Sequence, residues 1–263
     1  MQRMKLDFKD EAGRGVSISL PATIQNVGAN AQERRLLLLS IAKQAIEQRA
    51  CVFYVSENYD ESVWARIFSI AARAGRAKHC FAAELPDVTP ILPAEVLACE
   101  GILWHPTRWV PGSDKALYAF LTSLALALEG KKACQQVVVI LDGCASRAGS
   151  LPELLVSLAG QQNGDSTFIF SEQDARTLHP IVSGVSDCSI FMQVVGWGSE
   201  WAVAEQLGWS PLTSTPLPTL KQDEAIIRRQ VAGGGQHFER ISISPARFHL
   251  VKNLRPANHS AVA

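Results

Sequence analysis

Asp142 is the residue whose place in the sequence most clearly indicates chemistry. It ends the apolar run QQVVVILDG (residues 135–143), which is typical of a strand buried inside a parallel sheet. In many NTPases an aspartate at this place holds Mg²⁺ against a bound nucleotide, and an acid beside it positions the attacking water. Here the next residues are Gly143 and Cys144, and neither side chain can act in that way. Asp142 is therefore a candidate Mg²⁺ ligand only if nucleotide binds. The alternative is a turn or capping residue at the end of the strand.

The segment GANAQERR (residues 28–35) has the length of the phosphate-binding loop G-x-x-x-x-G-K-[ST]. In that loop the glycines let backbone N–H groups approach the phosphates, the lysine meets the β and γ phosphates, and the hydroxyl binds Mg²⁺. Gly28 matches the first glycine. The second glycine is replaced by Glu33, the lysine by Arg34 and the hydroxyl residue by Arg35. Gly28, Arg34 and Arg35 are thus candidate nucleotide contacts at a helix start. We favour the competing interpretation, that the QERR segment is the solvated first turn of an amphipathic helix.

Gln173 follows the next strand-like run along the chain, DSTFIFS (residues 165–171). The carboxyl ends of parallel strands are where α/β sheets keep their ligand sites, so the Gln173 amide is a candidate sensor of a γ-phosphate. The alternative is that SEQD opens a short helix, whose N-terminus favours the acidic Glu172 and Asp174.

Composition limits the remaining functions. The chain has 263 residues with 25 Lys plus Arg and 25 Asp plus Glu, so no overall charge favours nucleic acid or an anionic membrane. Its six cysteines form no C-x-x-C pair, and its six histidines show no metal-ligand spacing, which predicts reduced thiols and no protein metal cage. We find no signal peptide and no apolar run long enough to span a bilayer. A cytoplasmic protein is expected.

The predicted elements alternate strands with helices, the pattern of an α/β protein with a mainly parallel sheet. Strands are predicted at residues 15–24, 50–56, 80–85, 135–143, 165–171 and 187–195, with one more within 101–109. Helices are predicted at residues 33–48, 60–75, 113–130, 150–161, 199–207 and 220–231, with a short one at 172–178. A terminal hairpin is predicted at 235–253, and a flexible tail at 254–263. We find no linker, so residues 1–263 are predicted to form one domain. The three tryptophans of residues 196–209 are interpreted as core residues.

The order and spacing of these segments resemble the cytoplasmic motor domain of type IV secretion coupling proteins, the TraG/TraD group of the FtsK/HerA class of RecA-like ATPases. Residues 50–85 resemble the second strand, turn and helix of that domain, although its D-x-K-x-D turn reads SENYD here and keeps only Asp60. Residues 137–178 resemble the Walker B strand, a leucine-proline helix and a strand followed by glutamine. This stretch is associated with the TraM-recognition domain. Residues 233–253 resemble the closing hairpin more loosely.

The resemblance implies a RecA-like P-loop-NTPase-type fold: a mainly parallel sheet flanked by helices, with a C-terminal β-hairpin. It also implies ATP with Mg²⁺ as the cofactor, Asp142 as the Mg²⁺ holder and Gln173 as the phosphate sensor. The chain differs from the family at the positions that bind phosphate and catalyse hydrolysis. No residue matches the phosphate lysine, and Gly143 stands in the place of the catalytic glutamate. The family's membrane helices are missing, and residues 86–135 are too short for its inserted helical domain.

Our first hypothesis is therefore a catalytically degenerate domain that acts as a binding or scaffold component of a type IV secretion or conjugative DNA-transfer apparatus. Its partners would be coupling-protein motor subunits, or secretion adaptor and substrate proteins, which would also hold it at the inner membrane; a homo-oligomer is open. One alternative is an active ATPase with a non-standard loop, completed in trans by a partner's acid. The other is an ATP-independent DNA-binding component, for which only the run RIFSIAARAGRAKH, with Arg66, Arg73, Arg76 and Lys78, supplies a basic patch.

Overall fold

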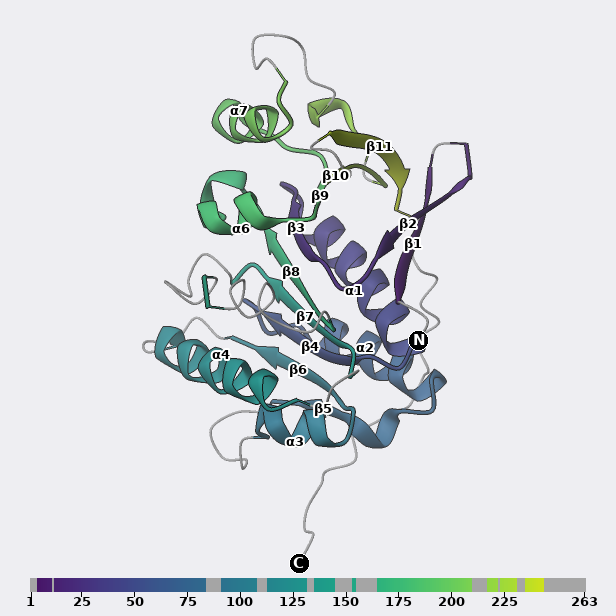
Figure 1. The fold of residues 1–263 in the computed structure, drawn as a ribbon, viewed down its shortest axis with the longest axis vertical. Coiled ribbons are helices and arrows are strands. Elements are labelled where there is room, and N and C mark those ends of the chain that lie inside the picture. The colour runs from purple at the N-terminus through teal and green to yellow at the C-terminus, as the bar shows by residue number, and fades with distance from the viewer. Residues whose placement is uncertain are drawn as a thin grey trace, which may run out of the picture.

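A large, twisted sheet forms the centre of the molecule (Figure 1). The computed structural model describes residues 4–10, 12–83, 91–107, 113–131, 135–144, 153–154, 165–209, 217–221, 223–230 and 235–243. Within these residues the sheet has 11 strands in the order β2-β1-β11-β10-β9-β3-β8-β7-β4-β6-β5. Its fold class is α/β, as the alternation of elements predicts.

The sheet has a parallel part and an antiparallel edge. The parallel strands are β3 (Thr23–Val27), β4 (Cys51–Ser56), β5 (Cys80–Ala82), β6 (Ile102–Pro106), β7 (Val137–Asp142), β8 (Ser166–Glu172) and β9 (Cys188–Phe191). The antiparallel strands are β1 (Lys5–Asp10), β2 (Gly15–Ser19), β10 (Glu224–Gln230) and β11 (Gln236–Ser242). The central strands β3, β4, β7 and β8 are buried along their whole length, which is why they read as continuous apolar runs.

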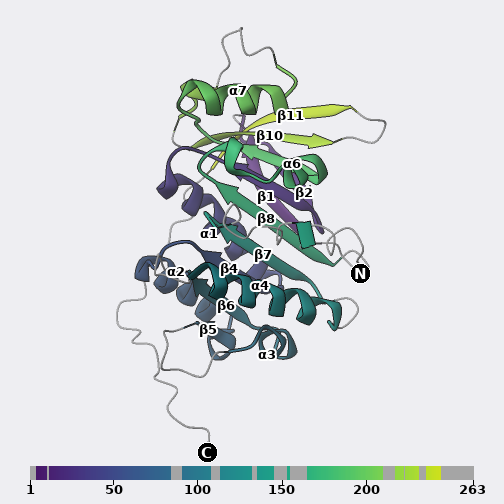
Figure 2. The same cartoon turned by 90° about the vertical axis from the view of Figure 1, so that its left-hand side faces the viewer.

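Helices cover both faces of the sheet. They are α1 (Ala31–Glu47), α2 (Glu61–Arg73), α3 (Pro93–Ala98), α4 (Ser113–Glu129), α6 (Pro180–Val185) and α7 (Trp197–Gln206), with 3-10 turns at Ala77–His79, Ala175–Thr177 and Leu217–Thr219. Figure 2 shows α4, α6 and α7 in front of the sheet.

Side chains alternate between the two faces along each strand, and this alternation builds two separate cores. On β4, Val52 and Tyr54 belong to the core that is completed by α1 and α2. Phe53 and Val55 belong to the opposite core, which is completed by α3, α4, α6 and α7. The sheet is therefore held rigidly between two apolar layers, with its loops free to form a site at the strand ends.

Most predicted elements are present, but two were wrong. The helix predicted at residues 220–231 is strand β10, which pairs with β9 and β11. β10 and β11 form a hairpin, so the hairpin predicted at 235–253 is described only as far as β11, and residues 244–253 lie outside the described residues. The strand predicted at residues 15–24 is divided in two around Pro21, as β2 and β3, and β3 continues to Val27. The helix predicted at 150–161 lies largely outside the described residues, and the tail at 254–263 lies wholly outside them.

Candidate functional site

The carboxyl ends of β3, β4, β7 and β8 meet at one edge of the sheet. The strand register sets Asp142 of β7 beside Ser56 of β4 on one side and Ser171 of β8 on the other. On the far side of β8, Glu172 lies beside Val27 of β3. The loop that begins at Gly28 and the carboxylate of Asp142 therefore belong to one site, with β8 between their strands.

The loop after β3 is short and closed. Helix α1 begins at Ala31, so residues 28–30 alone connect it to β3. The Gly28 N–H donates to the Glu172 carbonyl over 3.3 Å, and the Ala29 N–H donates to the Gln193 carbonyl over 2.9 Å. A Cβ at Gly28 would lie 2.8 Å from the Met192 Cβ. The first two amides of this loop are thus bonded to the protein itself.

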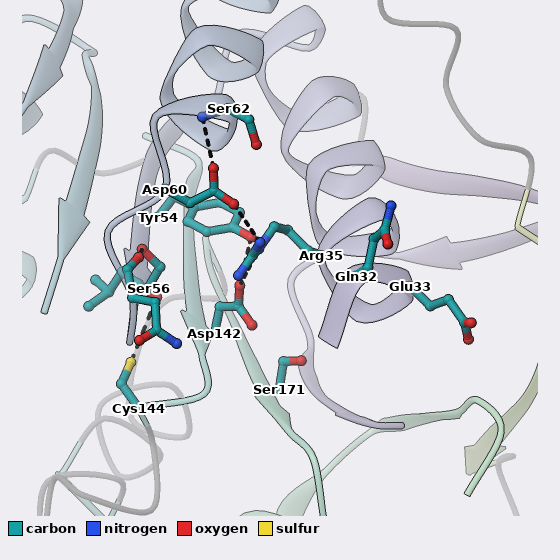
Figure 3. A network of polar contacts seen from close by, with 12 residues as sticks. Gln32, Glu33, Arg35, Tyr54, Ser56, Asp60, Ser62, Asp142, Cys144 and Ser171 are labelled. Carbon is teal, nitrogen blue, oxygen red and sulfur yellow. Dashed lines mark hydrogen bonds and ion pairs between the residues drawn. The ribbon is translucent and has the colours of Figure 1, made fainter. Parts of the chain in front are cut away.

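The N-terminus of α1 is capped by the protein's own side chains. The Asn30 Oδ1 accepts hydrogen bonds from the N–H groups of Gln32 (2.9 Å) and Glu33 (3.4 Å). The Asn30 Nδ2 donates to the Glu33 Oε1 over 2.7 Å. This is where a helix would otherwise attract an anion. Figure 3 shows Glu33 pointing away from Asp142, on the other side of the helix end.

The interpretation of this turn as solvated was wrong, although it is helical as predicted. Glu33 is 8% exposed and Arg34 is 5% exposed. Burial raises the pKa of the Glu33 carboxyl, against the lowering effect of its bond from Asn30. The Arg34 Nη1 donates to the Gly28 carbonyl over 2.5 Å, so the residue that replaces the lysine bonds its own loop. Burial lowers the pKa of the Arg34 guanidinium, while nearby Asp142 raises it.

Arg35 lies between two aspartates (Figure 3). Its Nη1 is 2.6 Å from Asp60 Oδ2, and its Nε is 3.9 Å from Asp142 Oδ2. The Tyr54 hydroxyl donates to the same Asp142 oxygen over 3.1 Å. Burial raises the pKa of the Asp142 carboxyl, while Arg34, Arg35 and the Tyr54 bond lower it. The positive charge that faces Asp142 is therefore supplied by the protein's own arginine side chains.

Glu57 is a site residue that sequence reasoning missed. It follows β4 directly, and its N–H donates to the Asp142 carbonyl over 2.8 Å. Gly143 has a φ of +72°, and a Cβ there would lie 3.1 Å from Glu57 Oε2. The acid beside Asp142 thus comes from the neighbouring strand rather than from residue 143. The sequence could have indicated Glu57, because it is a charged residue directly after the apolar run at 50–56, just as Asp142 stands at the end of its own apolar run.

A cleft of about 460 Å³ opens at this edge of the sheet. Its lining residues are Ala29, Arg34, Glu57, Gly143, Glu172, Gln173, Asp174, Thr177, Val195 and Ser199. Gln173 is exposed and lines the cleft together with Arg34, whereas Glu33 and Asp142 are not among the described lining residues. The wall carries three carboxylates, and hydrogen bonds from Arg176 hold the pKa of the Asp174 carboxyl below its usual value. The cleft wall therefore carries carboxylates beside the Arg34 guanidinium, and Asp174 is already paired with Arg176.

The residues present do not fit a magnesium nucleotide. The N–H groups of Gly28 and Ala29 and the helix N-terminus are bonded to protein groups, Arg35 lies 3.9 Å from Asp142, and three carboxylates line the cleft. Among the described residues, the buried Nε atoms of Arg34 and Arg35 at this site have no hydrogen-bond partner. Like charges at about 4 Å repel by about 4 kcal/mol at an effective dielectric constant of about 20. The described residues also contain no group of three or more His, Cys, Asp or Glu side chains able to hold a metal ion.

Two further segments were considered in the sequence, the basic run at 66–79 and the tryptophans of residues 196–209. Arg76, from the basic run, is buried and donates to the carbonyls of Ile46, Ala50 and Glu100, so it ties α1, α2 and α3 together instead of facing DNA. The tryptophans at 197 and 201 are 67% and 40% exposed, so their interpretation as core residues was wrong. Trp209, which packs against Phe238, is partly buried as expected.

No helix within the described ranges is long and apolar enough to cross a bilayer. The chain matches none of the protein-family models, and no curated protein sequence matches it. Solved structures do match. The genome packaging NTPase B204 of Sulfolobus turreted icosahedral virus 2, in complex with ATP-gammaS, aligns with a TM-score of 0.55 and 13% identity, over 83% of this chain and 96% of that one.

Two other similar structures are larger than this chain. The cytoplasmic domain of the type VII secretion ATPase EccC of Thermomonospora curvata aligns with a TM-score of 0.58 and 8% identity, over 91% of this chain and 28% of that one. The pCW3 conjugation coupling protein TcpA with ATPgS aligns with a TM-score of 0.51 and 12% identity, over 92% of this chain and 66% of that one. At such identities the likeness concerns the fold. The chain has the α/β fold of P-loop ATPases, with a large, mostly parallel sheet flanked by helices.

Proposed function

We propose that the chain is a nucleotide-independent binding component of a secretion or conjugation apparatus, built on the fold of a P-loop ATPase. The observation that carries the proposal is the state of the loop after β3. Its amides donate to Glu172 and Gln193, its helix is capped by Asn30, and its arginine bonds its own carbonyl. The amides of Gly28 and Ala29, the helix N-terminus and the Arg34 Nη1 each have a partner within the protein, and we infer that the fold is retained by its cores while the phosphate chemistry is lost.

The kind of apparatus is inferred from the solved structures that share this fold. Two of the similar structures are named as a type VII secretion ATPase and a conjugation coupling protein, and a third as a genome packaging NTPase. We propose that this chain works beside motor subunits of the TraG/TraD kind or beside secretion adaptor and substrate proteins. It would reach the inner membrane through them, from the cytoplasm, as a single domain spanning residues 1–263.

Steady-state ATP hydrolysis by the full chain tests the proposal. We expect phosphate release at the background rate, unchanged in Glu57→Gln, the variant of the carboxylate beside Asp142. Hydrolysis above background that is lost in Glu57→Gln would contradict the proposal.

The same assay addresses the second candidate function, an ATPase completed in trans. Glu57 favours it, because an acid does lie beside Asp142. If copies of the chain complete each other's sites, the specific rate rises with protein concentration, since the active species is an oligomer. We expect no such rise.

A further inference from the structure

Helix α4 presents an apolar face to solvent. Its inner side chains belong to one of the two cores: Leu117, Leu121, Leu124, Ala125 and Leu128. On its outer side, Tyr118 is 54% exposed and Leu126 is 64% exposed. Figure 2 shows the helix in front of the sheet, toward the viewer. Between Lys115 and Glu129 the helix has no charged residue, whereas the solvent face of a helix is usually polar or charged. Such a face indicates a surface that another protein chain covers.

The spacing of the outer residues is the same from either end of the helix. Thr122 is at the centre, with Tyr118 and Leu126 four residues to either side. Lys115 and Glu129 follow three residues further out, one at each end. These five residues lie within about 80° around the helix axis, because a helix turns about 100° per residue. We call them the α4 stripe. Two antiparallel copies can contact each other through the same stripe, as a two-fold interface requires.

The charges at the two ends of the stripe fit this arrangement. Lys115 and Glu129 are both exposed. In an antiparallel pair of α4 helices centred on Thr122, Lys115 of each copy meets Glu129 of the other copy. In a parallel pair in register, like charges would meet instead. The stripe is therefore complementary in charge to a second, antiparallel copy of itself.

The helix dipole favours the same partner. The N-terminus of a helix favours anions and its C-terminus favours cations. Lys115 is in the first turn of α4 and Glu129 is its last residue, so each is at the unfavourable end of its own helix. An antiparallel neighbour places each of them beside the opposite helix end, where its charge is stabilising.

We propose that the chain forms a two-fold dimer through the α4 stripe, with Thr122 on the axis. Tyr118 of each copy packs against Leu126 of the other, and Lys115 pairs with Glu129. The stripe is about 21 Å long, and one helix pair covers less than the roughly 1,200–2,000 Å² of a standard interface, so we expect a weak, reversible dimer. No residue of α4 is among the described lining residues of the cleft, so this inference does not depend on the proposed function.

Sedimentation equilibrium of the full chain, from micromolar to submillimolar protein, tests the proposal. The chain has a mass of 28.6 kDa, and we expect the average mass to rise toward twice that value. Leu126→Glu should abolish the rise, because it sets a carboxylate against Tyr118 of the other copy. The matched control Val185→Glu changes a 44% exposed residue of α6 and should not alter the rise. A wild-type chain that stays monomeric, or equal effects of the two variants, would overturn the proposal and leave the face to a different protein.

Charge reversal tests which residues meet. Lys115→Glu and Glu129→Lys each create two like-charge contacts in the dimer, and we expect each to raise the dissociation constant about tenfold at low salt. An equimolar mixture of the two variants should dimerise as the wild type does, because every contact is then between opposite charges. This recovery would also show that both variants fold. A mixture that associates no better than either variant alone would contradict the pairing.

Cysteine trapping tests the direction of the helix pair. In the antiparallel dimer residue 122 lies beside its own copy, whereas residue 116 lies about 18 Å from its copy along the helix axis. Under oxidation by copper phenanthroline, Thr122→Cys should form a disulfide-linked dimer above the wild-type background. Ala116→Cys, which is exposed on the same helix, should not. Cross-linking of Ala116→Cys without cross-linking of Thr122→Cys would contradict the antiparallel pair.

Discussion

Replacing Arg35 with methionine should destabilise the protein even though no ligand is present. Methionine keeps an apolar stem and removes the guanidinium, so Asp142 and Asp60 lose the cation between them. If Arg35 were instead held for a nucleotide phosphate, its loss would weaken binding and leave the stability of the free protein unchanged. The variant therefore separates a structural charge from a ligand-binding one.

The size of the effect follows from the two distances. Opposite charges 3.9 Å apart, as for Arg35 and Asp142, attract by about 4 kcal/mol at an effective dielectric constant of about 20. The contact with Asp60 is closer, but both side chains are partly exposed, so it adds at most about 1 kcal/mol. Removing Arg35 also removes its own desolvation cost, which offsets part of the loss. We expect the free energy of unfolding to fall by about 2–3 kcal/mol.

The loss should depend on pH in a defined direction. Burial raises the pKa of Asp142 above its ordinary value of 3.8, and removing Arg35 raises it further. An acid with a raised pKa in the folded state binds its proton more readily there than in the unfolded chain. Its ionised form is therefore unfavourable above the folded pKa, and this penalty fades as the pH falls through that pKa toward 3.8. The deficit of Arg35→Met should be full at neutral pH and shrink in acid.

Urea unfolding followed by circular dichroism, from pH 7 down to about pH 4, measures both quantities. The matched control is Lys43→Met on the same helix, because Lys43 and Glu47 lie 3.8 Å apart but are well exposed. Its cost should stay below about 0.5 kcal/mol. The reasoning would be refuted if the two variants lost equally little stability, or if the deficit of Arg35→Met grew in acid.

The remaining predictions concern packing and thiols. Gly28→Ala should lower the free energy of unfolding by about 1–3 kcal/mol, because the new Cβ would lie 2.8 Å from the Met192 Cβ. The control Gly184→Ala, whose Cβ would have nothing within 4 Å, should not destabilise the protein. Equal urea midpoints for the two variants would contradict this prediction. Gly143→Ala should lower the free energy of unfolding by about 1–2 kcal/mol, because the φ of +72° at this position is unfavourable for alanine. A melting temperature equal to that of the wild type would contradict this prediction. Burial raises the pKa of three thiols to about 12, those of Cys51, Cys80 and Cys188. At pH 8 these thiols should react with a disulfide reagent only after the protein unfolds. Peptide mapping that finds any of them labelled rapidly in the folded protein would contradict this prediction.

The sequence was most informative where local pattern and burial agree. Residues 137–141 are all apolar, and they form a strand buried on both faces, with Asp142 at its carboxyl end. A helix was predicted from residue 60, and α2 begins directly after Asp60, whose side chain accepts a hydrogen bond from the Ser62 N–H. In each case the residue's neighbours in sequence are sufficient to fix its place.

Prediction failed where distant contacts decide the outcome. The run EAIIRRQ at 224–230 has residues that suit either a helix or a strand, and its pairing with β9 and β11 makes it a strand. The QERR turn was predicted to be solvated because charged side chains are usually exposed. Arg34 is nevertheless buried, because its guanidinium donates a hydrogen bond to the Gly28 carbonyl. Glu57 was missed because its neighbour in the site, Asp142, is 85 positions away and the two meet only through the β4–β7 pairing.

Isothermal titration of the full chain with Mg²⁺ and ATPγS tests the central claim most directly. If the loop after β3 no longer holds phosphate, no saturable heat will appear up to millimolar nucleotide. A micromolar dissociation constant that is abolished by Asp142→Ala would contradict the account, because it would mean that the loop opens and that Asp142 exchanges its arginine partner for a bound metal ion.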